Sequence, residues 1–327
     1  MSLLQVSQIS IREERSFALK NISFSQEPLQ KIAIAGETGS GKSTLLQIIA
    51  GLVQPDTGEV RFQGKKVIGP ADTLVPGHAG IAYLSQQFEL PPFLRVEQVL
   101  SYANTLSGAE AGALYELCHI DYLLDRKTNQ LSGGERQRIA LAKLLLGAPK
   151  FLLLDEPFSN LDMGHKNLLK KVIRNIGEKL GITLILISHD PLDTLSWADE
   201  ILVLKEGALV QKGTPPEIYG QPINQYVAAL FGECNLVPTL QAHLFAGLHN
   251  LKPNGKDLLI RPENIKIASV NNGNPIGQVT RVTYFGAYYE IAVQLSGNQL
   301  KVKTNQAEVT PGDLVSIAVT PADLWYI

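Results

Sequence analysis

Three short apolar runs along the chain predict buried β-strands. They are Lys31–Ala35, Phe151–Leu154 and Ile182–Ile187. None of them alternates regularly between polar and apolar residues, so both faces of each strand should be covered. Between residues 151 and 210 such runs alternate with helical stretches, which is typical of a parallel sheet joined by helices. The pattern therefore predicts an α/β core.

The segments around these runs complete one large domain. Leu3–Ser10 and Phe17–Ser25 read as strands of an antiparallel layer, and a hairpin is expected around Gly58–Val67. Residues 87–146 are mainly helical in pattern and should form a helical subdomain. We expect this domain to cover residues 3–233.

The chain changes character after about residue 235. Short strands separated by turns rich in Gly, Asn and Pro replace the mixture of strands and helices, which is typical of a small barrel. The expected strands are Leu258–Ile260, Ile265–Ala268, Gly277–Thr283, Tyr288–Leu295, Gln299–Thr304 and Leu314–Val319. The prediction is a second, all-β domain over residues 236–327.

A glycine-rich loop follows the first apolar run. Its residues are Gly36, Glu37, Thr38, Gly39, Ser40, Gly41, Lys42, Ser43 and Thr44. In this pattern the glycines let backbone N–H groups surround a phosphate chain, the lysine reaches the β- and γ-phosphates, and the serine hydroxyl ligates Mg²⁺. The helical stretch that follows places the phosphates at a helix N-terminus, which favours anions. The loop therefore predicts a nucleotide-binding site.

Two acids close the second apolar run. Asp155 and Glu156 follow Phe151–Leu154, at the carboxyl end of a strand, where open α/β sheets place ligand-binding groups. After a phosphate-binding loop, this arrangement predicts that Asp155 assists Mg²⁺ and that Glu156 polarises a water molecule. Glu156 could instead be a structural acid that starts a helix or forms a salt bridge.

The order of these and further motifs resembles the nucleotide-binding subunits of ABC transporters over residues 3–233. Leu131–Arg138 is similar to the signature segment, which simpler phosphate-loop ATPases lack. Tyr83–Gln86 resembles the Q-loop, Ser159–Asp162 the D-loop, and Ile187–Asp190 the segment that holds the switch histidine. Motifs in the family's order and approximate spacing are far more specific than any one of them alone.

The resemblance implies a head-to-tail homodimer that encloses two ATP molecules. The phosphate loop of one subunit would carry each ATP, and Ser132, Gly133 and Gly134 of the other subunit would close over the γ-phosphate. The hydroxyl of Ser132 and the N-terminus of the following helix would both favour that anion. Two copies would give a symmetric dimer with both sites complete.

The resemblance also implies roles for four single residues. Glu156 would be the general base that orients the attacking water, and His189 would sense the γ-phosphate. Gln86 would contact Mg²⁺ or the water and report the nucleotide state to a membrane partner. Asp162 would cross the dimer interface, although it also suits an ordinary loop.

The sequence leaves two interpretations of the residue that stacks on the adenine. Members of the family usually have an aromatic residue upstream of the phosphate loop, and Ile11–Ser16 contains none. Phe17 is the nearest aromatic residue. It could stack on the base, or it could pack beneath the sheet.

The C-terminal domain has a resemblance of its own. Ile260–Asn264, Gly277–Gly286 and Pro311–Asp313 look like the OB-like accessory (TOBE) domain of importer ATPases, a group that includes maltose, spermidine/putrescine, ferric-iron, thiamine, molybdate and sulfate systems. Phe231–Leu236 resembles the linker of the polyamine and ferric-iron type. The barrel could extend the dimer interface, which we favour, or bind a regulator or an oxyanion.

Composition and sequence patterns limit the location and the partners that we expect for such a protein. The 327 residues carry a net charge of −2, which argues against a nucleic-acid partner. No apolar run reaches the roughly 18 residues that span a bilayer, the N-terminus has no signal-peptide pattern, and Cys118 and Cys234 lack metal-site spacing. We expect a cytoplasmic protein on the inner membrane face, with integral-membrane permease subunits as partners and, indirectly, an extracytoplasmic solute-binding protein.

The leading hypothesis is an importer ATPase. Exporter ATPases of this family usually lack the C-terminal barrel. Soluble ABC ATPases of DNA repair need a long coiled coil, and those of the ribosome carry two ATPase cores, whereas this sequence shows neither heptads nor an internal repeat.

Overall fold

The computed structural model describes all residues except 1, 14–15, 88, 242–254, 271–273 and 321–322. The chain folds into two compact units, Met1–Pro215 and Pro216–Ile327. They divide earlier than the expected boundary near residue 235, because helix α8 (Gln225–Phe231) and nearly all of α7 (Pro215–Gly220) group with the second unit. The domain limits 3–233 and 236–327 stay a prediction.

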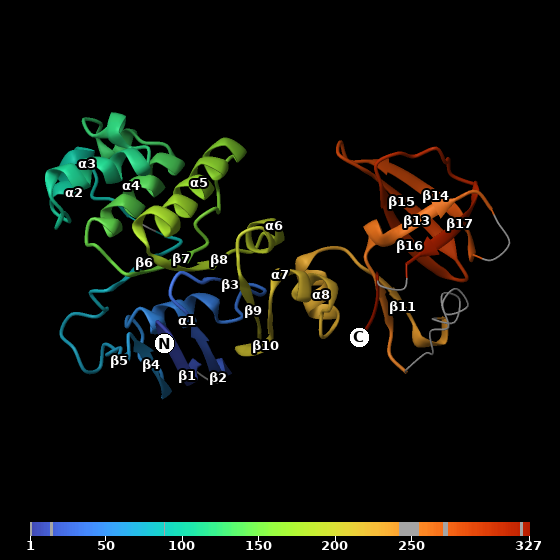
Figure 1. Ribbon diagram of the computed structural model, residues 1–327, viewed down its shortest axis with the longest axis horizontal. Coiled ribbons are helices and arrows are strands. Elements are labelled where there is room, and N and C mark those ends of the chain that lie inside the picture. The colour runs from blue at the N-terminus through green and yellow to red at the C-terminus, as the bar shows by residue number, and fades with distance from the viewer. Residues whose placement is uncertain (1, 14–15, 88, 242–254, 271–273, 321–322) are drawn as a thin grey trace. The chain divides into compact units, whose positions relative to one another are not determined.

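A six-stranded sheet forms the centre of the first unit (Figure 1), in the order β10–β9–β3–β8–β7–β6. Its strands are β3 (Lys31–Ala35), β6 (Ile81–Leu84), β7 (Phe151–Asp155), β8 (Thr183–Ile187), β9 (Glu200–Lys205) and β10 (Ala208–Gly213). Every neighbouring pair is parallel except β9 with β10. The predicted parallel sheet is therefore confirmed.

A second, antiparallel sheet has the order β2–β1–β4–β5. Its strands are β1 (Leu4–Glu13), β2 (Ser16–Gln26), β4 (Thr57–Phe62) and β5 (Lys65–Lys66). They match the antiparallel layer and the hairpin expected from the sequence. Their inner side chains share one apolar core with helix α1 (Lys42–Ile49) and with one face of the six-stranded sheet.

Other helices of the first unit contribute to a second core. They are α2 (Val96–Ser101), α3 (Gly108–Leu117), α4 (Gly133–Leu145), α5 (Met163–Leu180) and the short turn η1 (Asp121–Leu123). The first unit also contains the short helix α6 (Pro191–Leu195) and the turn η2 (Thr128–Gln130). Leu152 and Leu154 face the core that contains α4 and α5, whereas Phe151 and Leu153 face the core that contains α1. Both faces of β7 are covered, which explains its uninterrupted apolar run.

Beyond its two helices, the described part of the second unit consists of β-strands and two short helical turns. A five-stranded antiparallel sheet has the order β13–β17–β14–β15–β16, and a three-stranded sheet has the order β11–β12–β18. Both contribute to one core. The elements are β11 (Asn235–Val237), η3 (Thr239–Gln241), β12 (Leu258–Ile260), η4 (Pro262–Asn264), β13 (Ile265–Ala268), β14 (Ile276–Tyr284), β15 (Tyr289–Leu295), β16 (Asn298–Thr304), β17 (Leu314–Val319) and β18 (Leu324–Tyr326). The six predicted strands are confirmed, and β11 and β18 were not predicted.

A buried arginine holds the helices of the second unit to its sheets. Arg261, at the end of β12, is 2% exposed. Its guanidinium donates hydrogen bonds to the carbonyl groups of Tyr219, Ala228, Gly232 and Glu233. It also lies 4.1 Å from the centre of the Tyr219 ring. One side chain therefore fixes α7, α8 and the segment that follows them.

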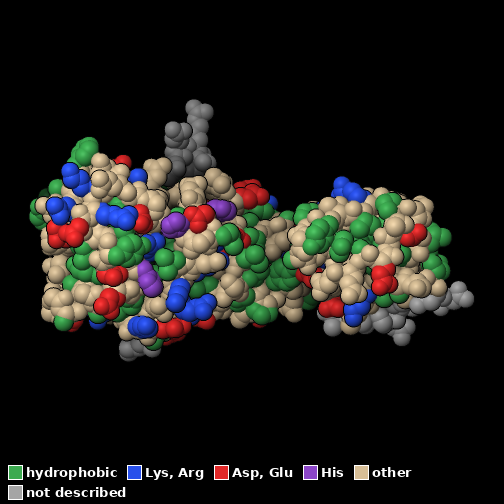
Figure 2. Space-filling model, turned by 90° about the horizontal axis from the view of Figure 1, so that it is seen from above, with side chains coloured by type: hydrophobic (Ala, Val, Ile, Leu, Met, Phe, Trp, Pro, Cys, Tyr) green, Lys and Arg blue, Asp and Glu red, His purple; other side chains and the backbone are tan. Residues whose placement is uncertain are grey.

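The surface seen in Figure 2 carries basic and acidic side chains interspersed on both units. In the described part of the chain, no helix is both long enough and apolar enough to cross a membrane.

Candidate nucleotide-binding and hydrolysis site

Four neighbouring strands place the predicted site residues at one edge of the sheet. In the order β6–β7–β8–β3, Gln86 lies shortly after β6, Glu156 follows β7, His189 lies shortly after β8, and the glycine-rich loop follows β3. The four strands are parallel, so their carboxyl ends lie side by side. Residues more than 100 positions apart in the sequence thereby meet, as the α/β pattern predicts.

The glycine-rich loop depends on glycine where it enters α1. Gly41 has φ +94°, and a Cβ atom there would lie 2.4 Å from the carbonyl oxygen of Ala18, so a larger residue would be strained and would clash. Lys42 lies along the loop, and its Nζ donates to the carbonyl oxygens of Gly36 at 2.9 Å and Glu37 at 2.8 Å. The ammonium group is therefore already placed inside the predicted phosphate site.

The ammonium group of Lys42 is partly buried, and three acids act on it. Burial lowers the pKa of Lys42, while the negative charges of Glu156, Asp155 and Glu37 act in the opposite direction. An ammonium group that has lost water gains strongly from a nearby anion, because screening is weak there. The loop thus has the electrostatic character of a phosphate site.

Asp155 has the geometry of a cation ligand. Its side chain is 3% exposed, and the Tyr83 hydroxyl donates to its Oδ2 at 2.9 Å. Its Oδ1 is buried and has no hydrogen-bond partner. Burial raises the pKa of Asp155, and hydrogen bonds involving Ser43 and Tyr83 oppose this. A buried oxygen without a partner is costly, so Asp155 and Ser43 fit a Mg²⁺ ion.

No group of three or more His, Cys, Asp or Glu side chains able to hold a metal occurs among the described residues. Mg²⁺ commonly uses only one or two carboxylates together with substrate phosphates. The two cysteines, Cys118 and Cys234, are free thiols.

Glu156 contacts two other predicted site residues. The Gln86 side-chain amide donates to Glu156 Oε2 at 3.1 Å, and His189 Nδ1 lies 3.3 Å from the same oxygen. The Glu156 backbone has φ +47°, and its N–H donates to the carbonyl oxygen of Ile187 at 3.1 Å. Positive φ is uncommon outside glycine, and such backbone strain concentrates at functional sites. Glu156 does not start a helix, because the next helix begins at Met163, whereas its contact with His189 also fits the alternative of a salt-bridge acid, so the catalytic role of Glu156 stays a prediction.

The signature residues begin α4. Ser132 is its N-cap, where Ser132 Oγ accepts from the Glu135 N–H at 3.3 Å and Glu135 Oε2 accepts from the Ser132 N–H at 2.8 Å. Gly133 and Gly134 form the first turn. A Cβ atom on Gly134 would lie 2.5 Å from the His165 ring, so the glycine allows α5 to approach closely.

Asp162 begins α5 in the same manner. It is the N-cap, and its Oδ1 accepts from the His165 N–H at 3.0 Å. His165 Nδ1 lies 2.6 Å from Asp162 Oδ2. This backbone bond and the side-chain bond to His165 lower the pKa of Asp162. The role of Asp162 at a dimer interface stays a prediction.

The two interpretations of Phe17 stay open. Phe17 lies in β2, but its side chain lies outside the part of the chain that the structure describes.

The sequence did not reveal a set of ion pairs that ties α5 to the switch-histidine segment. Lys166 lies 2.5 Å from Asp190 and 3.0 Å from Asp193, and Lys170 lies 2.5 Å from Asp193. The Asp193 side chain is 1% exposed, and Ser188 Oγ donates to it at 3.1 Å. The four-residue spacing of the lysines was visible in the sequence, but the element they face was not.

Replacing Lys166 with methionine should lower kcat for ATP hydrolysis by about tenfold or more, because small displacements of catalytic groups are costly. In this variant the ammonium group of Lys166 is missing, so the carboxylates of Asp190 and Asp193 repel each other beside His189. The KM for ATP should change little, since the phosphate loop is untouched. Steady-state phosphate release measures both values. Lys171→Met, on an exposed position of the same helix, is the matched control, and equal kcat values for the two variants would contradict the prediction.

The Lys166→Met substitution should also change how the thermal stability of the protein depends on pH. Burial raises the pKa of Asp190, but hydrogen bonds from Lys166 and from the Leu192 N–H outweigh this and hold the pKa below its ordinary value. A carboxyl group with a lowered pKa stabilises the fold above its unfolded pKa of about 3.9, and this stability is lost as pH falls through the lowered value. The Tm difference between wild type and Lys166→Met should therefore narrow below about pH 4.

Comparison with known proteins agrees with this geometry. Residues 19–159 match the ABC transporter family, and residues 258–327 match the TOBE domain. The spermidine/putrescine import ATP-binding protein PotA of Acetivibrio thermocellus is 30% identical over 94% of this chain and 91% of its own length. The chain belongs to the ABC transporter ATP-binding proteins. PotA of Spiroplasma citri is 30% identical over 99% of this ABC protein and 97% of its own length, and PotA of Clostridium acetobutylicum is 29% identical over 98% and 95%.

Solved ABC structures share the fold. The ADP conformation of the ATP-binding cassette MJ1267 matches 71% of this chain and 98% of its own with a TM-score of 0.60 at 24% identity. The cbiO1 protein from Clostridium perfringens, part of the ABC transporter complex cbiONQ, covers 66% of this chain and 90% of its own with a TM-score of 0.59 at 28% identity. The cassette MJ0796, a dimer bound to ADP and Pi, covers 65% and 98% with a TM-score of 0.56 at 26% identity. The predicted ABC ATPase fold is confirmed, and the chain is an ATP-hydrolysing enzyme.

Proposed function

We propose that this ABC protein is the ATP-hydrolysing subunit of a bacterial importer for polyamines. The observation that carries the enzymatic part is the contact of Gln86 and His189 with the same oxygen of Glu156, beside the phosphate loop. The TOBE match and the printed names of the relatives support import and polyamines. The protein would act on the cytoplasmic face of the membrane, with permease subunits and, indirectly, an extracytoplasmic solute-binding protein.

The residues of one chain divide the work of hydrolysis. Lys42 and the loop N–H groups bind the phosphates of ATP, and Asp155 and Ser43 would hold Mg²⁺. When bound, Mg²⁺ neutralises negative charge on the phosphates. Glu156 accepts a hydrogen bond from the attacking water and draws away its proton as the water oxygen approaches the γ-phosphorus. Gln86 and His189 keep the carboxylate in place, so the bond to the leaving ADP oxygen breaks in line.

In this proposal, a second copy of the chain completes the nucleotide-binding site. Helix α1 packs in one core of the first unit and α4 in the other, on opposite faces of the six-stranded sheet (Figure 1). The signature serine at the start of α4 is exposed. A two-fold related copy would bring its own Ser132 over the phosphate loop, and symmetry would complete both sites. The C-terminal unit would extend this dimer interface.

An apolar groove supports the permease partner. It has a volume of about 530 Å³, and its lining includes Leu52, Val75, Pro76, Tyr83 and Leu144. Val75 is 77% exposed and the neighbouring Leu74 is fully exposed, and contiguous exposed apolar side chains mark protein interaction sites. Tyr83 lines the groove and donates to Asp155. An apolar permease segment seated here would therefore contact a side chain bonded to the predicted Mg²⁺ ligand.

Transport by the reconstituted complex tests the solute class. Proteoliposomes would carry this chain with its permease subunits, with ATP on one side of the bilayer and the binding protein on the other. Labelled putrescine or spermidine should accumulate on the ATP side, and an excess of unlabelled polyamine should abolish this accumulation. Transport of ferric iron instead of polyamine would overturn the assignment of solute while leaving the ATPase subunit in place.

A further inference from the structure

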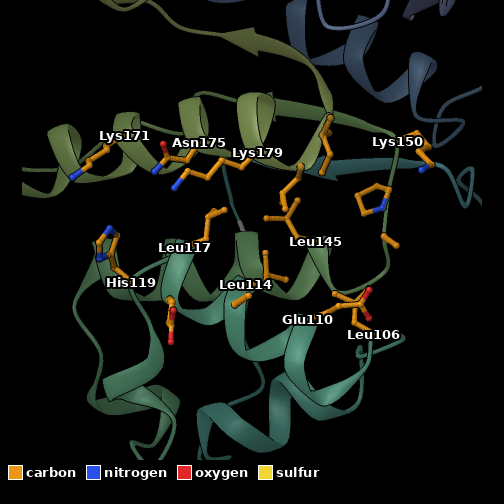
Figure 3. Close-up of a pocket in the computed structure, with 16 residues that line it drawn as sticks. Leu106, Glu110, Leu114, Leu117, His119, Leu145, Lys150, Lys171, Asn175 and Lys179 are labelled. Carbon is orange, nitrogen blue, oxygen red and sulfur yellow. The ribbon is translucent and has the colours of Figure 1, made fainter.

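A second cavity lies in the first unit, apart from the nucleotide site. Its volume is about 740 Å³, and it opens between α3 and α5 with a side chain of α4 in its lining (Figure 3). No residue of the glycine-rich loop lines it, and neither Glu156 nor His189 does. The volume lies within the range of small-molecule sites. The established family activity gives this cavity no use.

The floor of the cavity is apolar. Leu114 and Leu117 from α3, Leu145 from α4 and Ile182 line it. Leu114, Leu117 and Leu145 extend toward the space between the helices in Figure 3. Leu114 is 4% exposed and Leu145 is 3% exposed, so a ligand would contact the surface of a packed core.

One wall of the cavity is positively charged. Lys171, Asn175 and Lys179 are four residues apart on α5, so they share one face of the helix, and Figure 3 shows them on the side of α5 that borders the cavity. Lys150 lines the opposite end. None of these three lysines forms an ion pair within the described part of the chain.

The acidic side chains of the lining do not cancel this charge. Glu110 and Glu116 come from α3. The carboxylate of Glu110 already accepts hydrogen bonds from the N–H and the hydroxyl of Ser107 at 2.9 and 2.7 Å, where it completes a capping box. The lining therefore carries three lysines without ion pairs against two glutamates, and one of these glutamates is already engaged in this cap. The lining favours an anionic group beside an apolar body.

We propose that this cavity binds a free amphipathic carboxylate of the size of a medium-chain fatty acid. Lys171 and Lys179 bind the carboxylate, Asn175 between them donates a further hydrogen bond, and the alkyl chain covers Leu114, Leu117 and Leu145. A cationic amphiphile would meet the lysines unfavourably, and a neutral one would leave them unpaired. The site is independent of the proposed transport function.

Calorimetric titration of the full chain with dodecanoate, below its micelle concentration, tests the proposal. Saturating ADP keeps the phosphate loop occupied, so that anion binding there does not contribute. We expect one saturable site. Dodecanol and dodecyltrimethylammonium should bind at least tenfold more weakly than dodecanoate. No saturable binding up to millimolar dodecanoate, or equal binding of the three head groups, would overturn the proposal.

Two variants locate the site. Lys171→Glu with Lys179→Glu should weaken dodecanoate binding at least tenfold, whereas Lys65→Glu with Lys66→Glu, the same change of charge on exposed β5, should leave it within about twofold. Ala113→Trp, at an exposed lining position, should block the cavity without disturbing the core. Equal weakening by both lysine pairs, or full binding by Ala113→Trp, would show that the ligand binds elsewhere and would contradict the assignment.

Discussion

Replacing Glu156 with glutamine should lower kcat for ATP hydrolysis by about 10²- to 10⁴-fold, the usual loss when a general base is removed. Glutamine keeps the shape and can still hydrogen-bond to Gln86, but it cannot accept the proton of the attacking water. ATP binding should change only a few fold, because Lys42 and the loop are untouched. Phosphate release under saturating ATP measures kcat, and equilibrium binding of labelled ATP measures affinity.

A second glutamate provides the control for this experiment. Glu178→Gln, at an exposed position on α5, removes the same charge away from the site and should keep kcat within about twofold. If Glu156→Gln hydrolysed ATP at the rate of Glu178→Gln, Glu156 would not be the base. A variant that lost ATP binding together with kcat would instead point to a damaged site.

Replacing Arg261 with methionine should lower the free energy of unfolding of the second unit by about 3 kcal/mol or more. Methionine fills much of the space, but the carbonyl groups of Tyr219, Ala228, Gly232 and Glu233 lose their donor. Each buried polar group left without a partner costs about 1–3 kcal/mol. Loss of this contact should release α7 and α8 from the sheets.

Tryptophan fluorescence can follow that unit by itself. The chain has two tryptophans, and Trp325 donates to the carbonyl oxygen of Pro222 at 2.9 Å within the second unit. In a Trp197→Phe background, Trp325 becomes the only tryptophan. Lys266→Met is the control, because Lys266 is an exposed residue of β13, and surface substitutions of this kind usually change the free energy of unfolding by less than about 0.5 kcal/mol. Equal losses in the two variants would refute the anchoring role of Arg261.

The centre of the site could be predicted because parallel strands order their ends. Gln86, Glu156 and His189 each follow an apolar strand, and β6, β7 and β8 are neighbours. The sequence therefore contained both the motif and its approximate position. The contact of Gln86 and His189 with one oxygen of Glu156 depends on side-chain torsions, which no pattern of residues specifies.

Other parts of the site depend on tertiary packing. Tyr83 was predicted only as part of the Q-loop segment, but its hydroxyl binds Asp155 because β6 and β7 pair with Tyr83 opposite Leu153. Lys166 meets Asp193 only because the tertiary fold brings α5 close to α6. Neither approach follows from local sequence.

In the second unit, too, some elements depend on tertiary packing and could not be predicted from the local sequence. Strands β11 and β18 contain three residues each, too few to show alternation. They exist because both pair with β12, which lies more than 20 residues from β11 and more than 60 from β18. Likewise Arg261 was noticed only as part of an accessory-domain motif, and its hydrogen bonds explain why α7 and α8 group with the sheets that follow.

The most direct test of an ATP-driven importer subunit compares wild type with Glu156→Gln in the reconstituted complex. Accumulation of labelled putrescine on the ATP side should require both ATP and the wild-type chain, and the variant should bind ATP without accumulating solute. Hydrolysis of ATP by the wild-type complex with no net inward transport, or equal accumulation by the variant, would contradict the account.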